Sequence, residues 1–149
     1  MTDTAALKEP TGLEMIRALM SGTSDYRGIA HLLAFKLVVA EKGFVVFEGH
    51  PTQSVYNPIG TVHGGYAATL LDSAMACAVH TMMKAGQGYT TLELKVAYHR
   101  AMNDQSGPVR AEGKVISLGR SAAFAEGRLL DKAGKLCATA TTTCLVFSK

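Results

Sequence analysis

The hydrophobic pattern of the N-terminal part changes from helical to strand periodicity near residue 32. Apolar residues recur at helical spacing across residues 11–20, which predicts a short amphipathic helix ended by Gly22. From Leu32 the period becomes two, and two runs of strand-forming residues, 32–40 and 44–50, flank Glu41-Lys42-Gly43. These runs predict a β-hairpin, followed by an irregular loop.

The longest apolar stretch, residues 65–84, predicts one long helix. One stripe of this helix is apolar, and Met75, Ala76 and Val79 make its other faces apolar as well. A helix that is apolar on all sides is surrounded by protein rather than laid on a surface. We therefore expect this helix at the centre of the fold.

Four alternating segments follow the long helix, at residues 90–99, 109–118, 122–131 and 136–147. The order of helix, two strands, long helix and four strands predicts an α+β fold. We expect an antiparallel six-stranded sheet wrapped around one long central helix, with a short N-terminal helix. The length of 149 residues fits a single domain over residues 1–149, of which about 1–30 form an N-terminal extension.

The composition is that of a globular protein, with 48% hydrophobic and 18% charged residues. Fifteen basic and twelve acidic side chains give a net charge of +3 without blocks of like charge, so we expect no nucleic-acid partner. The cysteines Cys77, Cys137 and Cys144 lack CxxC spacing and the histidines lack ligand spacing. The sequence therefore predicts neither a disulfide framework nor a metal site.

Two segments bear on the cellular compartment. Residues 1–10 contain charges and no apolar core, so we expect no secretory signal. Residues 66–83 are apolar enough to suggest a membrane span, but Asp72 lies in the middle, where a charge would be costly in a bilayer. We therefore expect a cytoplasmic protein without membrane association.

Asp72 is the one formal charge between Glu48 and Lys84. Aspartate has poor helix propensity in mid-helix and has no cap to satisfy there. Burying a carboxylate is costly unless it is paired, hydrogen-bonded or protonated. A hydrogen bond to a nearby loop or a solvent-facing position would explain Asp72 without chemistry, but the apolar surroundings favour a functional carboxylate.

The segment His63-Gly64-Gly65 directly precedes the long helix. Paired glycines at a helix N-terminus allow a ligand to approach free N–H groups, and the helix dipole favours negative charge there, as in an oxyanion hole. A tight turn into the helix is the alternative interpretation. Gly64 and Asp72 are eight residues apart, about 12 Å along a helix axis. If both serve one reaction, they come from different copies of the chain, which predicts a homodimer with two-fold-related sites.

Four segments carry a family resemblance: Asn57-Pro-Ile-Gly-Thr-Val-His-Gly-Gly65, Leu70-Leu-Asp-Ser-Ala74, Thr91-Leu-Glu-Leu-Lys-Val-Ala-Tyr98 and Ser117-Leu-Gly-Arg-Ser-Ala-Ala-Phe-Ala-Glu-Gly127. Together they resemble the hotdog-fold acyl-CoA thioesterases, specifically the PaaI-like branch of the phenylacetate pathway. The resemblance covers the chain from about residue 32 onward. It implies a hotdog fold, active sites at a dimer interface, and hydrolysis of acyl-CoA to free acid and CoA.

The resemblance also implies roles for individual residues. Gly64 would donate its N–H to the thioester carbonyl, and Asp72 of the other subunit would act as general base or as nucleophile. Asn57 would hold the water or acyl group, Thr91 would orient the water, and His63 would contact the thioester or brace the loop. For these last three, a turn residue, a strand threonine and a loop-bracing histidine remain open as structural interpretations.

Coenzyme A requires cations near its phosphates, and residues 84–135 contain four more basic than acidic side chains. The resemblance places Arg120, in the Gly119-Arg120-Ser121 turn, near the nucleotide or pantetheine. Arg100 is a second candidate, and Gly65 is a candidate contact at the helix N-terminus. A solvated surface charge is the alternative for either arginine. We expect no metal and no cofactor, because CoA is part of the substrate.

Three functions fit these observations. The leading one is a thioesterase acting on aryl- or medium-chain acyl-CoA. A hotdog hydroxyacyl-thioester dehydratase would pair a histidine with a helix acid, and a non-catalytic acyl-CoA-binding domain would tolerate loss of Asp72. Ala76 lacks the hydroxyl that some benzoyl-CoA-type relatives place there, which favours the PaaI-like branch and leaves base and nucleophile roles open. We expect a homodimer that pairs into a dimer of dimers, with the pairing mode and the preferred acyl group open.

Overall fold

The computed structural model describes residues 9–22 and 28–148, and it contains the predicted elements in the predicted order. Residues 1–8 and 23–27, both part of the predicted N-terminal extension, lie outside the described residues. The elements are α1 Gly12–Met20, α2 Ile29–Leu32, β1 Phe35–Glu41, β2 Phe44–Gly49, the 3-10 helix η1 Gln53–Val55, α3 Gly64–His80, β3 Gln87–Tyr98, β4 Val109–Leu118, β5 Ala122–Leu130 and β6 Leu136–Ser148.

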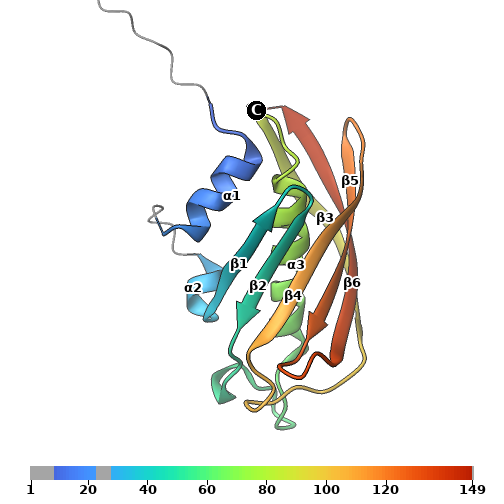
Figure 1. The fold of residues 1–149 in the computed structure, drawn as a ribbon. Helices are drawn as coiled ribbons and strands as arrows, with labels where there is room; N and C mark the ends of the chain where they lie inside the picture. Colours follow the sequence, from blue (N-terminus) through green and yellow to red (C-terminus); the bar gives the residue numbers. More distant parts are fainter. Residues whose placement is uncertain (1–8, 23–27, 149) are drawn as a thin grey trace, which may run out of the picture.

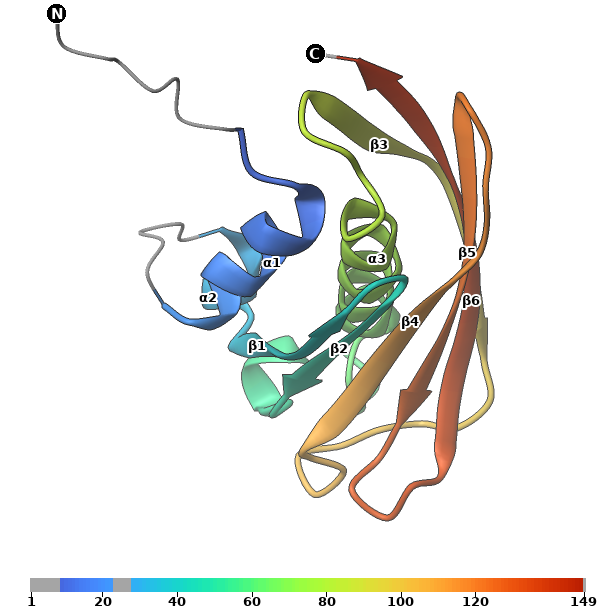
Figure 2. The same ribbon diagram turned by 45° about the horizontal axis from the view of Figure 1, so that its top comes forward.

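The six strands form one antiparallel sheet in the order β1-β2-β4-β5-β6-β3, which confirms the predicted sheet. The sheet curves around α3 on one side, and α1 and α2 lie beside β1 (Figures 1 and 2). After α3 the chain crosses to the far side of the sheet, where β3 pairs with β6. Strands β1 and β3 therefore form the two edges of the sheet.

The central helix is as closely surrounded as its apolar sequence predicts. Six residues of α3 have no exposed surface: Leu70, Leu71, Ala74, Met75, Ala78 and Val79. At Gly113 of β4, a side-chain methyl group would overlap the backbone of Ala74. The helix backbone thus lies directly on the sheet at this strand, and the absence of a side chain at Gly113 makes the close approach possible.

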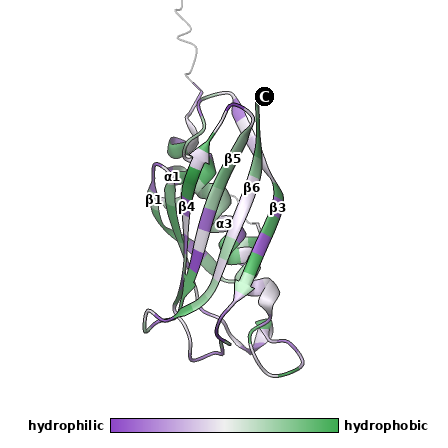
Figure 3. Ribbon diagram, turned by 90° about the vertical axis from the view of Figure 1, so that its right-hand side faces the viewer, coloured by the Kyte–Doolittle hydropathy of each residue, from purple (hydrophilic) through white to green (hydrophobic). Residues whose placement is uncertain are grey.

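The outer face of the sheet, turned toward the viewer in Figure 3, is not uniformly apolar. Lys114 of β4 lies opposite Glu126 of β5, and Glu112 lies opposite Arg128. These outward-facing neighbours alternate along β5 with residues that face the core. The alternation explains why the strand pattern was readable from the sequence.

The predicted α1 is confirmed and is anchored at both ends. Thr11 caps it, because its hydroxyl accepts the Glu14 N–H while the Glu14 carboxylate accepts the Thr11 N–H. The Gly12 N–H donates to the Met83 carbonyl at 3.0 Å, and Ile16 is buried. Arg17 donates from Nε to the Ala40 carbonyl on the edge strand β1 at 3.3 Å.

Three predicted boundaries were wrong by three residues or more, one of them the start of β3, which is Gln87 rather than Thr90. The first strand begins at Phe35 rather than Leu32, because residues 29–32 form a helical turn in which the Leu33 N–H donates to the Ile29 carbonyl. The long helix ends at His80 rather than Lys84. At Thr81 the hydroxyl donates to the Ala78 carbonyl and accepts the Gly43 N–H, which ties the helix end to the β1–β2 turn.

The close approach at Gly113 generates a stability prediction. Gly113→Ala places a methyl group against helix backbone that cannot rotate away, so we expect the free energy of unfolding to fall by about 3 kcal/mol. Lys114→Ala is the matched control on the neighbouring, exposed position, and we expect a change within about 0.5 kcal/mol. Urea unfolding followed by circular dichroism measures both. Equal stability of the two variants would show that the helix does not rest on β4.

Candidate active site

Asp72 lies midway along α3 and is partly exposed rather than buried. The Thr91 hydroxyl donates to the Asp72 carboxylate, with 3.1 Å between Oγ1 and Oδ1. Thr91 belongs to β3, so this hydrogen bond joins the central helix to the edge strand. The structure thus brings together two of the residues predicted to act on water.

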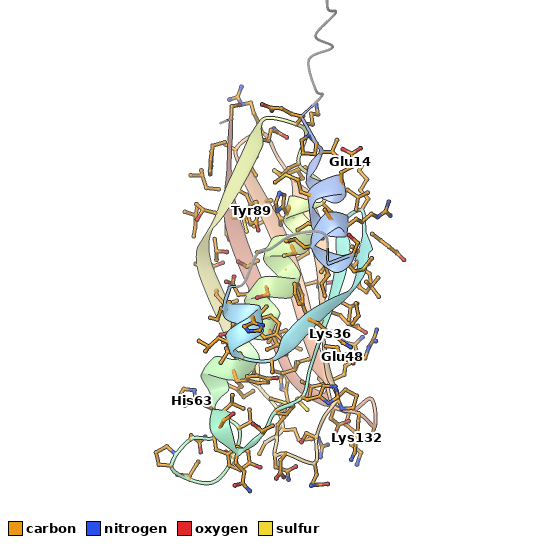
Figure 4. The ribbon with its side chains drawn as sticks, turned by 90° about the vertical axis from the view of Figure 1, so that its left-hand side faces the viewer. Glu14, Lys36, Glu48, His63, Tyr89 and Lys132 are labelled. Carbon is orange, nitrogen blue, oxygen red and sulfur yellow. The ribbon has the colours of Figure 1, made fainter. Side chains whose placement is uncertain are left out.

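Both residues face a cavity of about 720 Å³ beside α3. Aromatic side chains of three different strands line it, namely Phe35, Phe47 and Tyr89. In Figure 4, Tyr89 on β3 and Lys36 on β1 lie on either side of α3, with the helix between them. The volume, and a lining that combines apolar side chains with polar ones such as His31, Lys36 and Asp72, are typical of a small-molecule site.

Cys77 also lines this cavity, about one and a half helical turns beyond Asp72. Burial and, to a lesser extent, the nearby Asp72 carboxylate together raise the pKa of the Cys77 thiol from 9.0 to about 12. The side chain therefore stays a neutral thiol at physiological pH. A cysteine nucleophile needs the thiolate, so Cys77 is a wall of the cavity rather than a second nucleophile.

The N-terminus of α3 opens to a different hollow, of about 340 Å³. Gly64, Arg100 and Tyr98 line this hollow, and Asp72 does not. The Tyr98 hydroxyl donates to the Gly64 carbonyl at 2.9 Å, and its ring lies against the Gly64 Cα. The structure therefore places Gly64 and Asp72 in separate hollows of one chain.

His63 caps α3. Its Nδ1 accepts the Gly65 N–H at 2.8 Å, and its backbone is extended, with φ −61° and ψ 135°. The Gly65 N–H, assigned to substrate binding from the sequence, is thus occupied by His63. The Gly64 N–H precedes it at the first helical position, where a backbone donor has no partner inside the helix.

Asn57 uses its side chain within its own loop. Its Oδ1 accepts the N–H groups of Ile59 and Thr61, and its Nδ2 donates to the Thr61 hydroxyl. These contacts match the interpretation of Asn57 as a turn residue. Among the described residues of this single chain, those that line the Asp72 cavity or the Gly64 hollow do not include Asn57.

The predicted CoA-binding residues lie in two places. Arg100 lines the Gly64 hollow, directly after β3. The segment Gly119-Arg120-Ser121 forms the β4–β5 turn, where the Gly119 N–H donates to the Ala122 carbonyl and the Ser121 carbonyl accepts the Val146 N–H. No residue of that turn is among the described residues that line the Asp72 cavity or the Gly64 hollow.

Several residues that the structure places at these hollows were not predicted from the sequence. Tyr98 ends a segment used for the resemblance, but nothing in its local pattern predicts contact with Gly64. Leu19 of α1 and Ile29 of α2 line the Asp72 cavity, although they precede Asp72 by more than forty residues. The alternation in β3 was the one available signal, since it puts Tyr89 and Thr91 on the same face.

Two further properties concern the described residues as a set. Among residues 9–22 and 28–148, no group of three or more His, Cys, Asp or Glu side chains is arranged to hold a metal ion. No helix in that part of the chain has the length and apolar character needed to span a membrane.

Comparison with known proteins gives consistent matches. The family model described as "Thioesterase superfamily" matches residues 59–138. The chain is 29% identical over 126 residues to the proofreading thioesterase EntH of Klebsiella pneumoniae, covering 85% of this chain and 90% of that protein. It is 28% identical over 122 residues to the 1,4-dihydroxy-2-naphthoyl-CoA hydrolase of Listeria monocytogenes, covering 82% and 98%. A crystal structure of a phenylacetic acid degradation-related protein from Ralstonia eutropha superposes with a TM-score of 0.78 at 26% identity, covering 87% of this chain and 98% of that protein.

The raised pKa of Cys77 generates a prediction about thiol reactivity. At pH 8 the native thiolate fraction is about a thousandth of that in the unfolded chain, because the pKa rises from 9.0 to about 12. We expect iodoacetamide to alkylate native Cys77 about a thousandfold more slowly than in denaturant, as measured by peptide mass spectrometry. Asp72→Asn removes one cause of the raised pKa, so we expect it to speed native alkylation.

The raised pKa of Cys77 also determines how the free energy of unfolding changes with pH. The folded-state pKa lies above the unfolded one, so the contribution of Cys77 is present below pH 9 and lost as pH rises toward 12. Cys77→Ala should flatten the fall in stability over that range. Equal alkylation rates in native and denatured protein at pH 8 would contradict the raised pKa.

Proposed function

The chain belongs to the thioesterase superfamily, and we propose that it hydrolyses the thioester of an acyl-CoA to a free acid and CoA. The names of the relatives support this substrate class, since one is a thioesterase and another hydrolyses a naphthoyl-CoA. The observation that carries the proposal is the Asp72 carboxylate, held by Thr91 at the wall of a largely apolar cavity. Aryl and medium-chain acyl groups are the classes we propose for it.

Asp72 supplies the reactive group by one of two routes. As general base, it takes a proton from a water whose oxygen attacks the thioester carbon; the C–S bond then breaks and the CoA thiolate takes up a proton. As nucleophile, its Oδ attacks that carbon and releases CoA, and water then cleaves the mixed anhydride to free acid. In both routes Thr91 is positioned to hold the carboxylate or the water.

The N-terminus of α3 supplies the second component. Negative charge develops on the carbonyl oxygen during attack on a thioester, and the Gly64 N–H at the start of a 17-residue helix can donate a hydrogen bond to that oxygen. His63 supports this geometry by capping the next N–H, which orients the first turn. In this proposal His63 braces the loop and does not transfer protons.

The two components come from two copies of the chain. Within one chain, Asp72 and Gly64 face different hollows and are separated by about 12 Å of rigid helix. Strand β3 is an edge of the sheet, and Leu92 and Tyr98 on it are 59% and 57% exposed. An exposed edge strand pairs readily with another strand.

Antiparallel pairing of β3 with β3 of a second copy completes the site. Thr91, bonded to Asp72, lies toward one end of β3, and Tyr98, bonded to Gly64, lies at the other. A two-fold axis near Leu94 and Lys95 brings Thr91 opposite Tyr98 of the partner subunit. The Gly64 of the partner subunit then lies near Asp72, and each dimer contains two such sites. We also expect two such dimers to pair into a tetramer.

The CoA portion extends away from the thioester toward basic side chains. Arg100 lies beside Gly64 in the same hollow, where it can meet the pantetheine or phosphates of a substrate bound to that helix end. Arg120 is exposed in the β4–β5 turn and is the candidate for the nucleotide. The proposed reaction draws on no cofactor besides the CoA of the substrate.

The central prediction of this proposal concerns Asp72. Asp72→Asn keeps the size and the hydrogen bond to Thr91 but removes the base or nucleophile. We expect kcat/KM for thiol release from benzoyl-CoA or octanoyl-CoA to fall by about a hundredfold or more. Asp104→Asn is the matched control, because Asp104 is exposed in a loop and lines neither hollow as described. We expect it to keep wild-type activity.

The outcomes separate the candidate functions. Hydrolysis by wild type that is lost in Asp72→Asn, with unchanged fold and size by circular dichroism and gel filtration, supports the thioesterase. Wild type that binds acyl-CoA without releasing thiol, and Asp72→Asn that binds equally well, would support a non-catalytic acyl-CoA-binding domain. Release of water from a 3-hydroxyacyl-CoA instead of thiol would support a dehydratase.

A further inference from the structure

One wall of the Asp72 cavity comes from the N-terminal helices, outside residues 59–138 that match the family model. Leu19 of α1 and Ile29 of α2 line the cavity. Across the cavity, α3 and β3 contribute Asp72 and Thr91. The reactive residues and the opposite wall therefore belong to different parts of the chain.

This wall is held in place by contacts that do not involve the reactive residues. The Gly12 N–H donates to the Met83 carbonyl, and a side chain at Gly12 would overlap the His80 carbonyl. Ile16 is 1% exposed in the main core, and Arg17 bonds to the edge of β1. The helix α1 is thus a fixed surface beside the cavity, as Figure 2 shows for its position next to β1 and α3.

The two wall residues are large apolar side chains that remain exposed. Leu19 is 40% and Ile29 is 51% exposed, and both line the cavity. An apolar ligand in the cavity would remove this surface from water, which is favourable in proportion to the area covered. The charged nucleotide of CoA would gain nothing from these contacts.

The chemistry fixes which part of the substrate meets this wall. The thioester carbon must lie at Asp72, and two chains of atoms leave that carbon, the acyl group and the pantetheine of CoA. The cavity is lined by Phe35, Phe47 and Tyr89 as well as by Leu19 and Ile29, and its basic side chains are His31 and Lys36. An apolar acyl group matches the apolar part of this lining, which includes Leu19 and Ile29.

Resting on the proposed function, we propose that Leu19 and Ile29 contact the distal part of the acyl group and determine which acyl-CoA the enzyme prefers. The matched family segment supplies the reaction, and the α1–α2 segment supplies the selection. Shortening the two side chains enlarges the far end of the cavity, and enlarging them fills it.

The test compares decanoyl-CoA with hexanoyl-CoA as substrates. We expect the double variant Leu19→Ala, Ile29→Ala to raise the ratio of kcat/KM for decanoyl-CoA over hexanoyl-CoA by about tenfold, and Ile29→Trp to lower it by about tenfold. Met20→Ala and Leu32→Ala are the matched controls, since these residues are 44% and 80% exposed on the same helices but do not line the cavity. We expect both controls to keep the wild-type ratio.

Two further measurements, inhibition by free CoA and binding of decanoate, test whether the wall contacts the acyl group. Competitive inhibition by free CoA should stay within about twofold in every variant, because the wall contacts the acyl group. An unchanged substrate ratio, or a change confined to CoA inhibition, would overturn the inference while leaving the thioesterase intact.

Calorimetric binding of decanoate tests the wall without turnover. If wild type hydrolyses no acyl-CoA, the proposed function fails. The inference about the wall still stands if Ile29→Trp abolishes decanoate binding and Leu32→Trp does not. Equal decanoate binding by these two variants would overturn it.

Discussion

The length of rigid helix between Gly64 and Asp72 is the constraint on which this account depends. Both groups are fixed on α3, and the axial rise of a helix keeps them about 12 Å apart whatever the loops do. A thioester carbonyl bound at one group is out of reach of the carboxylate at the other. In the proposed enzyme, a second copy of the chain is therefore part of the catalytic apparatus rather than only a source of stability.

The packing of α3 against the sheet holds Gly64 and Asp72 at this separation. The helix lies directly on β4 at Gly113, its end is tied to the β1–β2 turn through Thr81, and its middle has no exposed apolar surface. The helix face that turns away from β4 and β5 borders the cavity, and there the one carboxylate of the helix stays partly hydrated and bonded to Thr91. Close packing on one side and an open cavity on the other thus explain how a charge is tolerated in this helix.

Much of the fold could be predicted from the sequence because each element carries a local period. The strands alternate since one face meets α3 and the other meets solvent, and α3 is apolar all round because sheet surrounds it. Asp72 stood out for the same reason, as a charge that breaks the pattern. The turn at residues 29–32 was missed because four residues are too few to show a helical period. Tyr98, Leu19 and Ile29 were missed because their importance depends on contacts between segments far apart in the sequence.

The most direct test of the shared site mixes two inactive variants. Gly64→Pro removes the N–H that is the proposed oxyanion donor. Proline suits this first helical position, because His63 before it is extended. Gly64→Ala keeps the N–H and is the control for the contact of residue 64 with Tyr98. Asp72→Asn and Gly64→Pro chains, unfolded together and refolded, should recover about a quarter of wild-type thiol release. Half of the randomly paired dimers are then mixed, and each has one intact site. A mixture as inactive as its two components would show that Asp72 and Gly64 do not act across a dimer interface.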